Sequence, residues 1–206
     1  MTQIFLDTET TGVDHLNDSI VQLSCVVRVD GKETERHDWF MKPYKRNPMA
    51  PEATAVSGYT QEMVDGFPDN TIALKEFREM LDRYNLGSFI PGTGLKNKAF
   101  VVGYNVDFDI QMIHQWFEAN SYYDLWYKIW SPPIDVMQFA ALPFSLKGIR
   151  LHMKNFKLIT LYKTIYEEDF PNAHNSMADV LATMRIYDSL VSKYFPETLP
   201  ETTDNL

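Results

Sequence analysis

Apolar and polar positions divide the start of the chain into extended runs. Residues 3–8 are mostly apolar, and residues 20–29 form a β-branched stretch that reaches Asp30-Gly31, a strong two-residue hairpin signal. Residues 33–41 would then be the return strand. The pattern predicts three opening strands in an antiparallel meander, with the first strand central.

Helical periodicity dominates the later chain. Asp69-Asn70 offers an N-cap for a helix of about four turns. Its inward face is expected to carry Ile72, Phe77, Met80, Leu81 and Tyr84. Other helices are predicted at 52–56, 60–65, 107–119, 135–142, 156–166 and 175–194, with a loop at 85–98 and a short buried strand at 99–103. Strands first and helices alternating later indicate one α/β domain with a mixed sheet flanked by helices.

Composition agrees with one folded domain. The 206 residues are 45% hydrophobic and 23% charged, which excludes disordered, collagen-like and coiled-coil chains. We expect a domain over 1–194 and an acidic, mobile tail over 195–206. The lone Cys25 forbids an intramolecular disulfide, and neither a signal peptide nor an apolar stretch of roughly 20 residues is present. A cytoplasmic protein with no membrane contact is expected.

An aromatic segment at 122–130 stands apart from these patterns. It contains Tyr122, Tyr123, Trp126, Tyr127 and Trp130. Such a cluster can stack unpaired bases or cover a partner surface. Packing into the core is the favoured interpretation.

The net charge of −9 argues against a protein that grips long duplex nucleic acid by bulk electrostatics. Pairs of nearby carboxylates suggest instead a site for a divalent cation. Asp7 and Glu9 lie two apart on a predicted strand, so they project from one face, and a divalent cation would relieve their repulsion. The alternative for this pair is a solvent-facing edge beside a Thr-Thr-Gly turn.

Two further acidic sites follow later in the chain. Asp109 lies where a short strand meets a helix, and Asp179 lies at the start of the last helix, with His174 just before it. An imidazole beside a carboxylate suits a general base near a metal ligand. Capping and helix-dipole roles are the alternative for each of these residues.

Together these pieces resemble the DEDDh family of 3′–5′ exonucleases, which includes the proofreading epsilon subunit of bacterial DNA polymerase III. Asp7 to Gly12 resembles the family's first motif, Tyr104 to Asp109 the second, and His174 to Asp179 the third. Tyr104 and Ser57 depart from the pattern, since each stands where the family often has histidine.

The resemblance implies a ribonuclease H-like fold and a site with two Mg²⁺ or Mn²⁺ ions. The implied metal ligands are Asp7, Glu9, Asp109 and Asp179, with His174 taking the proton from the attacking water. The implied substrate contacts are Thr8, Thr10, Thr11, Val56, Ser57, Tyr104, Asn105 and Phe108.

The implied function is metal-dependent removal of nucleoside monophosphates from single-stranded 3′ ends of DNA. RNA is an alternative substrate, as in the ribonuclease T and oligoribonuclease branches, because sugar discrimination depends on pocket geometry. A polymerase or another replication or repair protein is a possible partner. A non-catalytic interaction module on the same fold is disfavoured, since it has no reason to keep mutually repelling carboxylates.

Overall fold

The computed structural model describes residues 1–170 and 175–196. Its sheet contains five strands in the order β3-β2-β1-β4-β5. Their bounds are β1 (Thr2–Thr10), β2 (Ile20–Val29), β3 (Lys32–Phe40), β4 (Phe100–Gly103) and β5 (Ile134–Asp135). The pairs β1–β2 and β2–β3 are antiparallel, whereas β4 pairs in parallel with β1 and β5 in parallel with β4. The predicted mixed sheet with a central first strand is confirmed.

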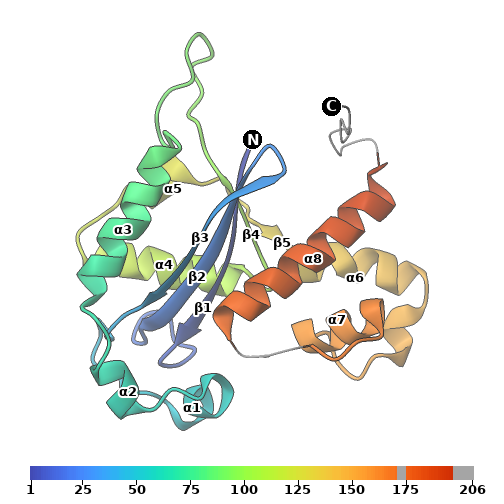
Figure 1. The fold of residues 1–206 in the computed structure, drawn as a ribbon, viewed down its shortest axis with the longest axis horizontal. Coiled ribbons are helices and arrows are strands. Elements are labelled where there is room, and N and C mark those ends of the chain that lie inside the picture. Colours follow the sequence, from blue (N-terminus) through green and yellow to red (C-terminus); the bar gives the residue numbers. More distant parts are fainter. Residues whose placement is uncertain (171–174, 197–206) are drawn as a thin grey trace.

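Helices flank both faces of this sheet (Figure 1). They are α1 (Pro51–Ser57), α2 (Gln61–Asp65), α3 (Asn70–Arg83), α4 (Asp107–Ala119), α5 (Leu125–Lys128), α6 (Val136–Leu146), α7 (Leu158–Tyr166) and α8 (Ser176–Tyr194), with a 3₁₀ turn at Ile149–His152. Helices α3 and α4 cover one face, and α6, α7 and α8 cover the other. The helix at 107–119 was predicted with the correct bounds.

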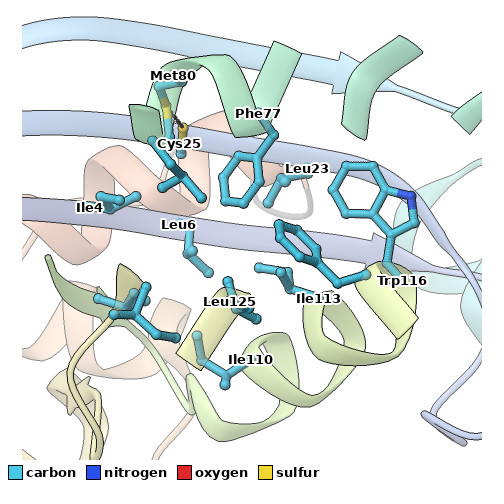
Figure 2. Close-up of a cluster of buried hydrophobic side chains, with 14 of the residues drawn as sticks. Ile4, Leu6, Leu23, Cys25, Phe77, Met80, Ile110, Ile113, Trp116 and Leu125 are labelled. Atoms are coloured by element: carbon cyan, nitrogen blue, oxygen red, sulfur yellow. Dashed lines mark hydrogen bonds between the residues drawn. The ribbon is translucent and has the colours of Figure 1, made fainter. Parts of the chain in front are cut away.

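The alternation of side chains along β1 fills two separate cores. Ile4 and Leu6 point toward α3 and α4, where they join Phe77 and Trp116 (Figure 2). Phe5 points the other way and is fully buried. Because β1 is apolar on both faces, it occupies the middle of the sheet, and its C-terminal end is fixed from both sides.

A side-chain cap fixes the start of α3, and a backbone hydrogen bond fixes the start of α1. The Asp69 side chain accepts a hydrogen bond from the backbone N–H of Thr71 and caps α3, as predicted. The backbone N–H of Ala50 donates to the Thr11 carbonyl at 2.7 Å, which holds the start of α1 beside the end of β1. The short helices α1 and α2 therefore lie at the same end of the sheet as the Asp-x-Glu motif.

Three details differ from the sequence predictions. Ile72 is 52% exposed, because it lies outside the face of α3 that Ala73, Leu74, Phe77, Met80 and Leu81 bury. Helix α6 continues through Pro143 to Leu146 instead of ending at residue 142. The rings of the 122–130 segment lie at the surface, and only Leu125 and Ile129 enter the core. A four-residue helix buries one side and leaves the others in solvent.

The remaining predictions concern the chain end and membranes. Of the predicted tail at 195–206, only Phe195 and Pro196 belong to the described residues. The Phe195 ring lies 5.9 Å from that of Phe139, centroid to centroid. No helix within residues 1–170 and 175–196 has the length and apolar character to cross a bilayer.

Candidate active site

Three carboxylates meet at the C-terminal end of β1. Asp7 and Glu9 project from the same face of the strand, and Asp179 reaches them from the first turn of α8. One oxygen from each side chain lies within 4.8 Å of the other two. The structure thus brings together residues separated by most of the chain, as the strand spacing and the third motif predicted.

Asp109 lies next to this cluster in the first turn of α4 and is only 4% exposed. Its Oδ1 accepts two hydrogen bonds from Thr8, one from the backbone N–H at 2.9 Å and one from the hydroxyl at 2.6 Å. Asp107, two residues earlier, is exposed. Of the two acids in this motif, only Asp109 faces the other carboxylates.

Gly103 allows the close approach of β4 that places Asp109. A Cβ atom at this position would lie 2.7 Å from Cγ2 of Val106 and 3.0 Å from the carbonyl oxygen of Leu6. The chain therefore turns from β4 into α4 directly against the end of β1. A larger residue would push the second motif away from the first.

A hydrogen bond attaches the N-terminus of α8 to β1. The hydroxyl of Ser176, which is fully buried, donates to the backbone carbonyl of Asp7 at 2.8 Å. Asn175 caps the helix by accepting from the N–H of Ala178. His174 lies outside the described residues, so its predicted role stays a prediction.

Burial and mutual repulsion disfavour ionisation of this cluster. Burial raises the pKa of Asp7 well above its usual range, and the neighbouring carboxylates raise it further. The pKa of Glu9 rises to about 8, first through burial and then through the charges of Asp179 and Asp109. Burial also raises the pKa of Asp109 to about 7, against the lowering effect of its bonds from Thr8.

This arrangement fits a divalent cation. Hard cations bind carboxylate oxygens, and a bound cation offsets both the burial cost and the repulsion that raise these pKa values. Asp7, Glu9 and Asp179 present their oxygens to one small volume, with Asp109 at its border. Chemically, the site can hold metal ions and thereby bind and polarise a phosphate group.

The predicted substrate contacts of the first motif lie along β1 and the following turn. The Thr10 hydroxyl donates to the Gly12 carbonyl at 2.6 Å. Thr11 is fully buried, and its hydroxyl accepts from the N–H of Ser19 at 2.9 Å. Thr8 is turned toward Asp109. These side chains therefore shape the end of the strand, and their contact with a substrate stays a prediction.

The predicted contacts on α1 differ in exposure. Val56 is 52% exposed on α1. The hydroxyl of Ser57 donates to the Ala53 carbonyl at 2.9 Å, within the same helix. Val56 thus offers an open apolar surface at this end of the sheet. The contacts of Val56 and Ser57 with a substrate stay predictions.

The predicted contacts of the second motif lie in the turn before α4 and in the first turn of that helix. The Tyr104 hydroxyl donates to the Phe156 carbonyl at 2.5 Å, and Phe108 packs against the α3–α4 core. Asn105 is exposed and has a positive φ of 58°, a conformation that asparagine tolerates better than most residues. Its N–H donates to Asp135 at 2.9 Å.

Two residues of the site were missed as functional by sequence reasoning. Asp135 caps α6, and its charge contributes to raising the pKa of Asp109. Ser176 attaches the start of α8 to the backbone carbonyl of Asp7. An acid before a helix reads as a cap in sequence, and only the pairing of β5 with β4 places Asp135 near Asp109.

Known proteins are similar to this chain in sequence. An exonuclease family model (RNase_T) matches residues 4–88. The DNA polymerase III PolC-type protein of Latilactobacillus sakei is 29% identical over 180 residues, which is 87% of this chain and 10% of that protein. The corresponding protein of Bacillus subtilis is 22% identical over 182 residues, covering 88% of this chain and 11% of that protein.

Solved structures share the fold. A structure of exonuclease I superposes with a TM-score of 0.73 at 21% identity and covers 96% of this chain and 42% of that chain. E. coli exonuclease I in complex with a dT13 oligonucleotide gives a TM-score of 0.69 at 20% identity, with the same coverage. This chain thus spans about a tenth of the PolC-type proteins and about two fifths of exonuclease I.

The fold is that of exonuclease I, and it carries a cluster of carboxylates at the end of β1. In sequence, the chain is similar to an exonuclease family over residues 4–88 and to the PolC-type proteins over most of its own length. The resemblance inferred from the three motifs is confirmed.

Proposed function

We propose that this chain is a metal-dependent 3′–5′ exonuclease that releases nucleoside monophosphates from single-stranded 3′ ends of DNA. The meeting of Asp7, Glu9 and Asp179 within 4.8 Å, with Asp109 beside them, carries the proposal. The exonuclease family match supports it. The oligonucleotide complexes of E. coli exonuclease I, which has the same fold, support DNA as the substrate.

Asp7, Glu9, Asp109 and Asp179 would hold two Mg²⁺ or Mn²⁺ ions. When bound, such ions supply stabilisation of the negative charge that develops on the entering and leaving oxygens of a phosphodiester. Carboxylates with raised pKa values suit this purpose, because cation binding favours their charged form.

The protein's own groups would bind and orient the strand and move the proton. His174 accepts the proton of the attacking water and then returns it to solvent. Val56 offers an exposed apolar surface for the terminal base. The turn at Thr10 and Thr11 and the turn at Tyr104 and Asn105 border the terminal nucleotide.

The chain would act as one unit, residues 1–194, together with a replication or repair polymerase. The PolC-type relatives support this partner, since their matching segment belongs to DNA polymerase III. A single-stranded 3′ end arises where a polymerase has inserted a mismatched nucleotide. The proposed activity would remove that end.

Substitution of Asp109, matched by substitution of Asp107, tests the site. Asp109→Asn removes a buried carboxylate beside the cluster, whereas Asp107→Asn removes an exposed one two residues away. With Mg²⁺ and a single-stranded oligonucleotide, we expect Asp109→Asn to lose nearly all turnover and Asp107→Asn to retain it. Circular dichroism checks that both variants fold. Equal turnover in the two variants would remove Asp109 from the proposed site.

A further inference from the structure

The aromatic rings of the 122–130 segment are exposed at the surface. Leu125 and Ile129 are buried at 2% and 3% exposure, whereas Trp126, Tyr127 and Trp130 are 41%, 55% and 39% exposed. Large aromatic side chains in solvent mark a binding surface more often than a packing defect. This part of the chain has no place in the site proposed above.

A hairpin formed by residues 86–98 adds charge to these rings. Phe89 and Lys96 form an antiparallel bridge within it. The ammonium group of Lys96 lies 4.1 Å from the ring centroid of Tyr127 and 5.4 Å from that of Phe89. The ammonium group of Lys98 lies 5.4 Å from the ring of Trp130. We call Phe89, Lys96, Lys98, Trp126, Tyr127 and Trp130 the aromatic-lysine surface.

The charge of this surface is opposite to that of the whole chain. Residues 86–98 contain two lysines and no acidic residue, in a chain of net charge −9. In the part of the chain that the structure describes, neither Lys96 nor Lys98 forms an ion pair. Lysines next to exposed aromatic faces are the combination with which proteins hold unpaired bases and their phosphates.

The surface lies within reach of a strand held at the carboxylates. The backbone N–H of Trp130 donates to the Ala99 carbonyl, and the next residue, Phe100, is opposite Gln3 of β1. Asp7 is four residues beyond Gln3, which is roughly 13 Å along a β-strand. At the roughly 3.4 Å between phosphates of a stacked strand, this distance is about four nucleotides.

Figure 1 shows the direction in which the surface extends. The hairpin (green) projects beyond the N-terminal end of β1, whereas the N-terminus of α8 lies at the opposite end of that strand. A bound strand would therefore run from the carboxylates along the β4 side of the sheet and then onto the hairpin.

We propose that the aromatic-lysine surface is a second binding site for single-stranded nucleic acid, which holds the strand several nucleotides upstream of its 3′ end. Bases would stack on Tyr127 and Trp130, and phosphates would pair with Lys96 and Lys98. This inference rests on the proposed exonuclease function. It explains exposed aromatic residues that the terminal-nucleotide pocket does not use.

A double variant and a matched control test this site. Lys96→Gln/Tyr127→Ala removes one charge and one ring from the surface. Lys75→Gln/Leu151→Ala removes one exposed lysine and one exposed apolar side chain elsewhere. Two substrates separate the sites: the p-nitrophenyl ester of thymidine 5′-monophosphate, which occupies only the carboxylate site, and a dT12 oligonucleotide.

The inference predicts that the double variant hydrolyses the ester as the wild type does, while its KM for dT12 rises about tenfold or more. The control should match the wild type on both substrates. Equal KM values for dT12 in both variants would overturn the inference and leave a polypeptide partner as the occupant of the surface. Failure of the wild type on both substrates would instead overturn the proposed function.

Tryptophan fluorescence gives a readout that does not depend on activity. Trp126 and Trp130 are exposed, whereas Trp39 and Trp116 are buried at 7% and 0% exposure. Quenching of the intrinsic fluorescence by dT12 in EDTA therefore reports contact at the surface. We expect quenching in the wild type and the control, and weaker quenching in the double variant. The absence of quenching in the wild type would contradict the inference.

Discussion

Thr8 controls the charge of a neighbouring acid. Its backbone N–H and its hydroxyl both donate to Oδ1 of Asp109, and these two bonds lower the pKa of a carboxyl that burial raises to about 7. A carboxylate must be deprotonated to bind a cation. Thr8 therefore acts as a positioning residue for Asp109.

Thr8→Val should weaken metal binding in a pH-dependent way. Valine keeps the shape and the backbone bond but removes the hydroxyl bond, so the pKa of Asp109 rises further above 7. Mg²⁺ affinity should fall at pH 7 and recover at pH 9, where the carboxyl is ionised again. Calorimetric titration at both values checks this. Thr164→Val, which removes a hydroxyl bonded within α7, serves as the control. Equal affinity of Thr8→Val and wild type at pH 7 would refute the role.

The same raised pKa values predict a pH-dependent stability without metal. Unfolded Glu and Asp titrate near 4, whereas Glu9 and Asp109 titrate at about 8 and about 7 in the fold. The folded state therefore binds more protons between these values, so its stability falls as the pH rises from about 4 to about 8.

We expect the melting temperature of the metal-free protein to fall between pH 5 and pH 8.5. The fall should be smaller in Glu9→Gln, which cannot ionise, and Mg²⁺ should reverse it in the wild type, because a ligand of the folded state stabilises that state. Scanning calorimetry across this range checks the prediction. A melting temperature that rises with pH in EDTA would contradict the assigned direction of the shifts.

At the scale of elements, the N-cap of α8 and the first residue of that helix have different tasks. Asn175 caps the helix and has no contact with β1 among its hydrogen bonds to described residues. Ser176 donates to the Asp7 carbonyl and thereby fixes the distance between Asp179 and the strand acids. Asn175 thus contributes to the stability of α8, whereas Ser176 also determines where Asp179 lies in the site.

Asn175→Ala and Ser176→Ala should both destabilise the fold, by about 1 kcal/mol each. Only Ser176→Ala should also lower kcat, because the start of α8 then loses its attachment to β1 and Asp179 shifts from the cluster. Denaturant unfolding and steady-state kinetics on both variants check this. A kcat loss of the same size in Asn175→Ala would show that the two residues do not divide these tasks.

Local sequence signals were sufficient to predict a turn or a helix start where one or two residues determine the backbone conformation. Asp30-Gly31 predicted the hairpin between β2 and β3, and Asp69 predicted the start of α3. The helix predicted at 135–142 was too short, because α6 continues through Pro143 to Leu146.

Packing over longer distances was harder to predict than local structure. The rings at 122–130 were expected in the core because they are apolar. The structure shows that Leu125, Lys128 and Ile129 take the buried positions of that short segment. Composition alone does not reveal which residues of a short helix face the protein.

At the scale of the whole molecule, the topology assembles the site. Asp7, Asp109 and Asp179 come from three elements far apart in sequence, and they meet because β4 lies beside β1 and α8 packs across β1 and β2. The strand period predicted only the pairing of Asp7 with Glu9. The other two acids followed from the resemblance of their motifs, and Asp135 required the sheet order itself.

The proposed exonuclease removes nucleotides stepwise from a free 3′ end with the help of divalent cations. The most direct test follows 5′-labelled and 3′-labelled single-stranded DNA and matched RNA, together with a covalently closed single-stranded circle, in Mg²⁺ and in EDTA. We expect 5′-labelled DNA to give a ladder of products that shorten by one nucleotide, and 3′-labelled DNA to release its label at once as a mononucleotide. The circle should stay intact, and no substrate should be cleaved in EDTA. Cutting of the circle, or full activity after exhaustive chelation, would contradict this account.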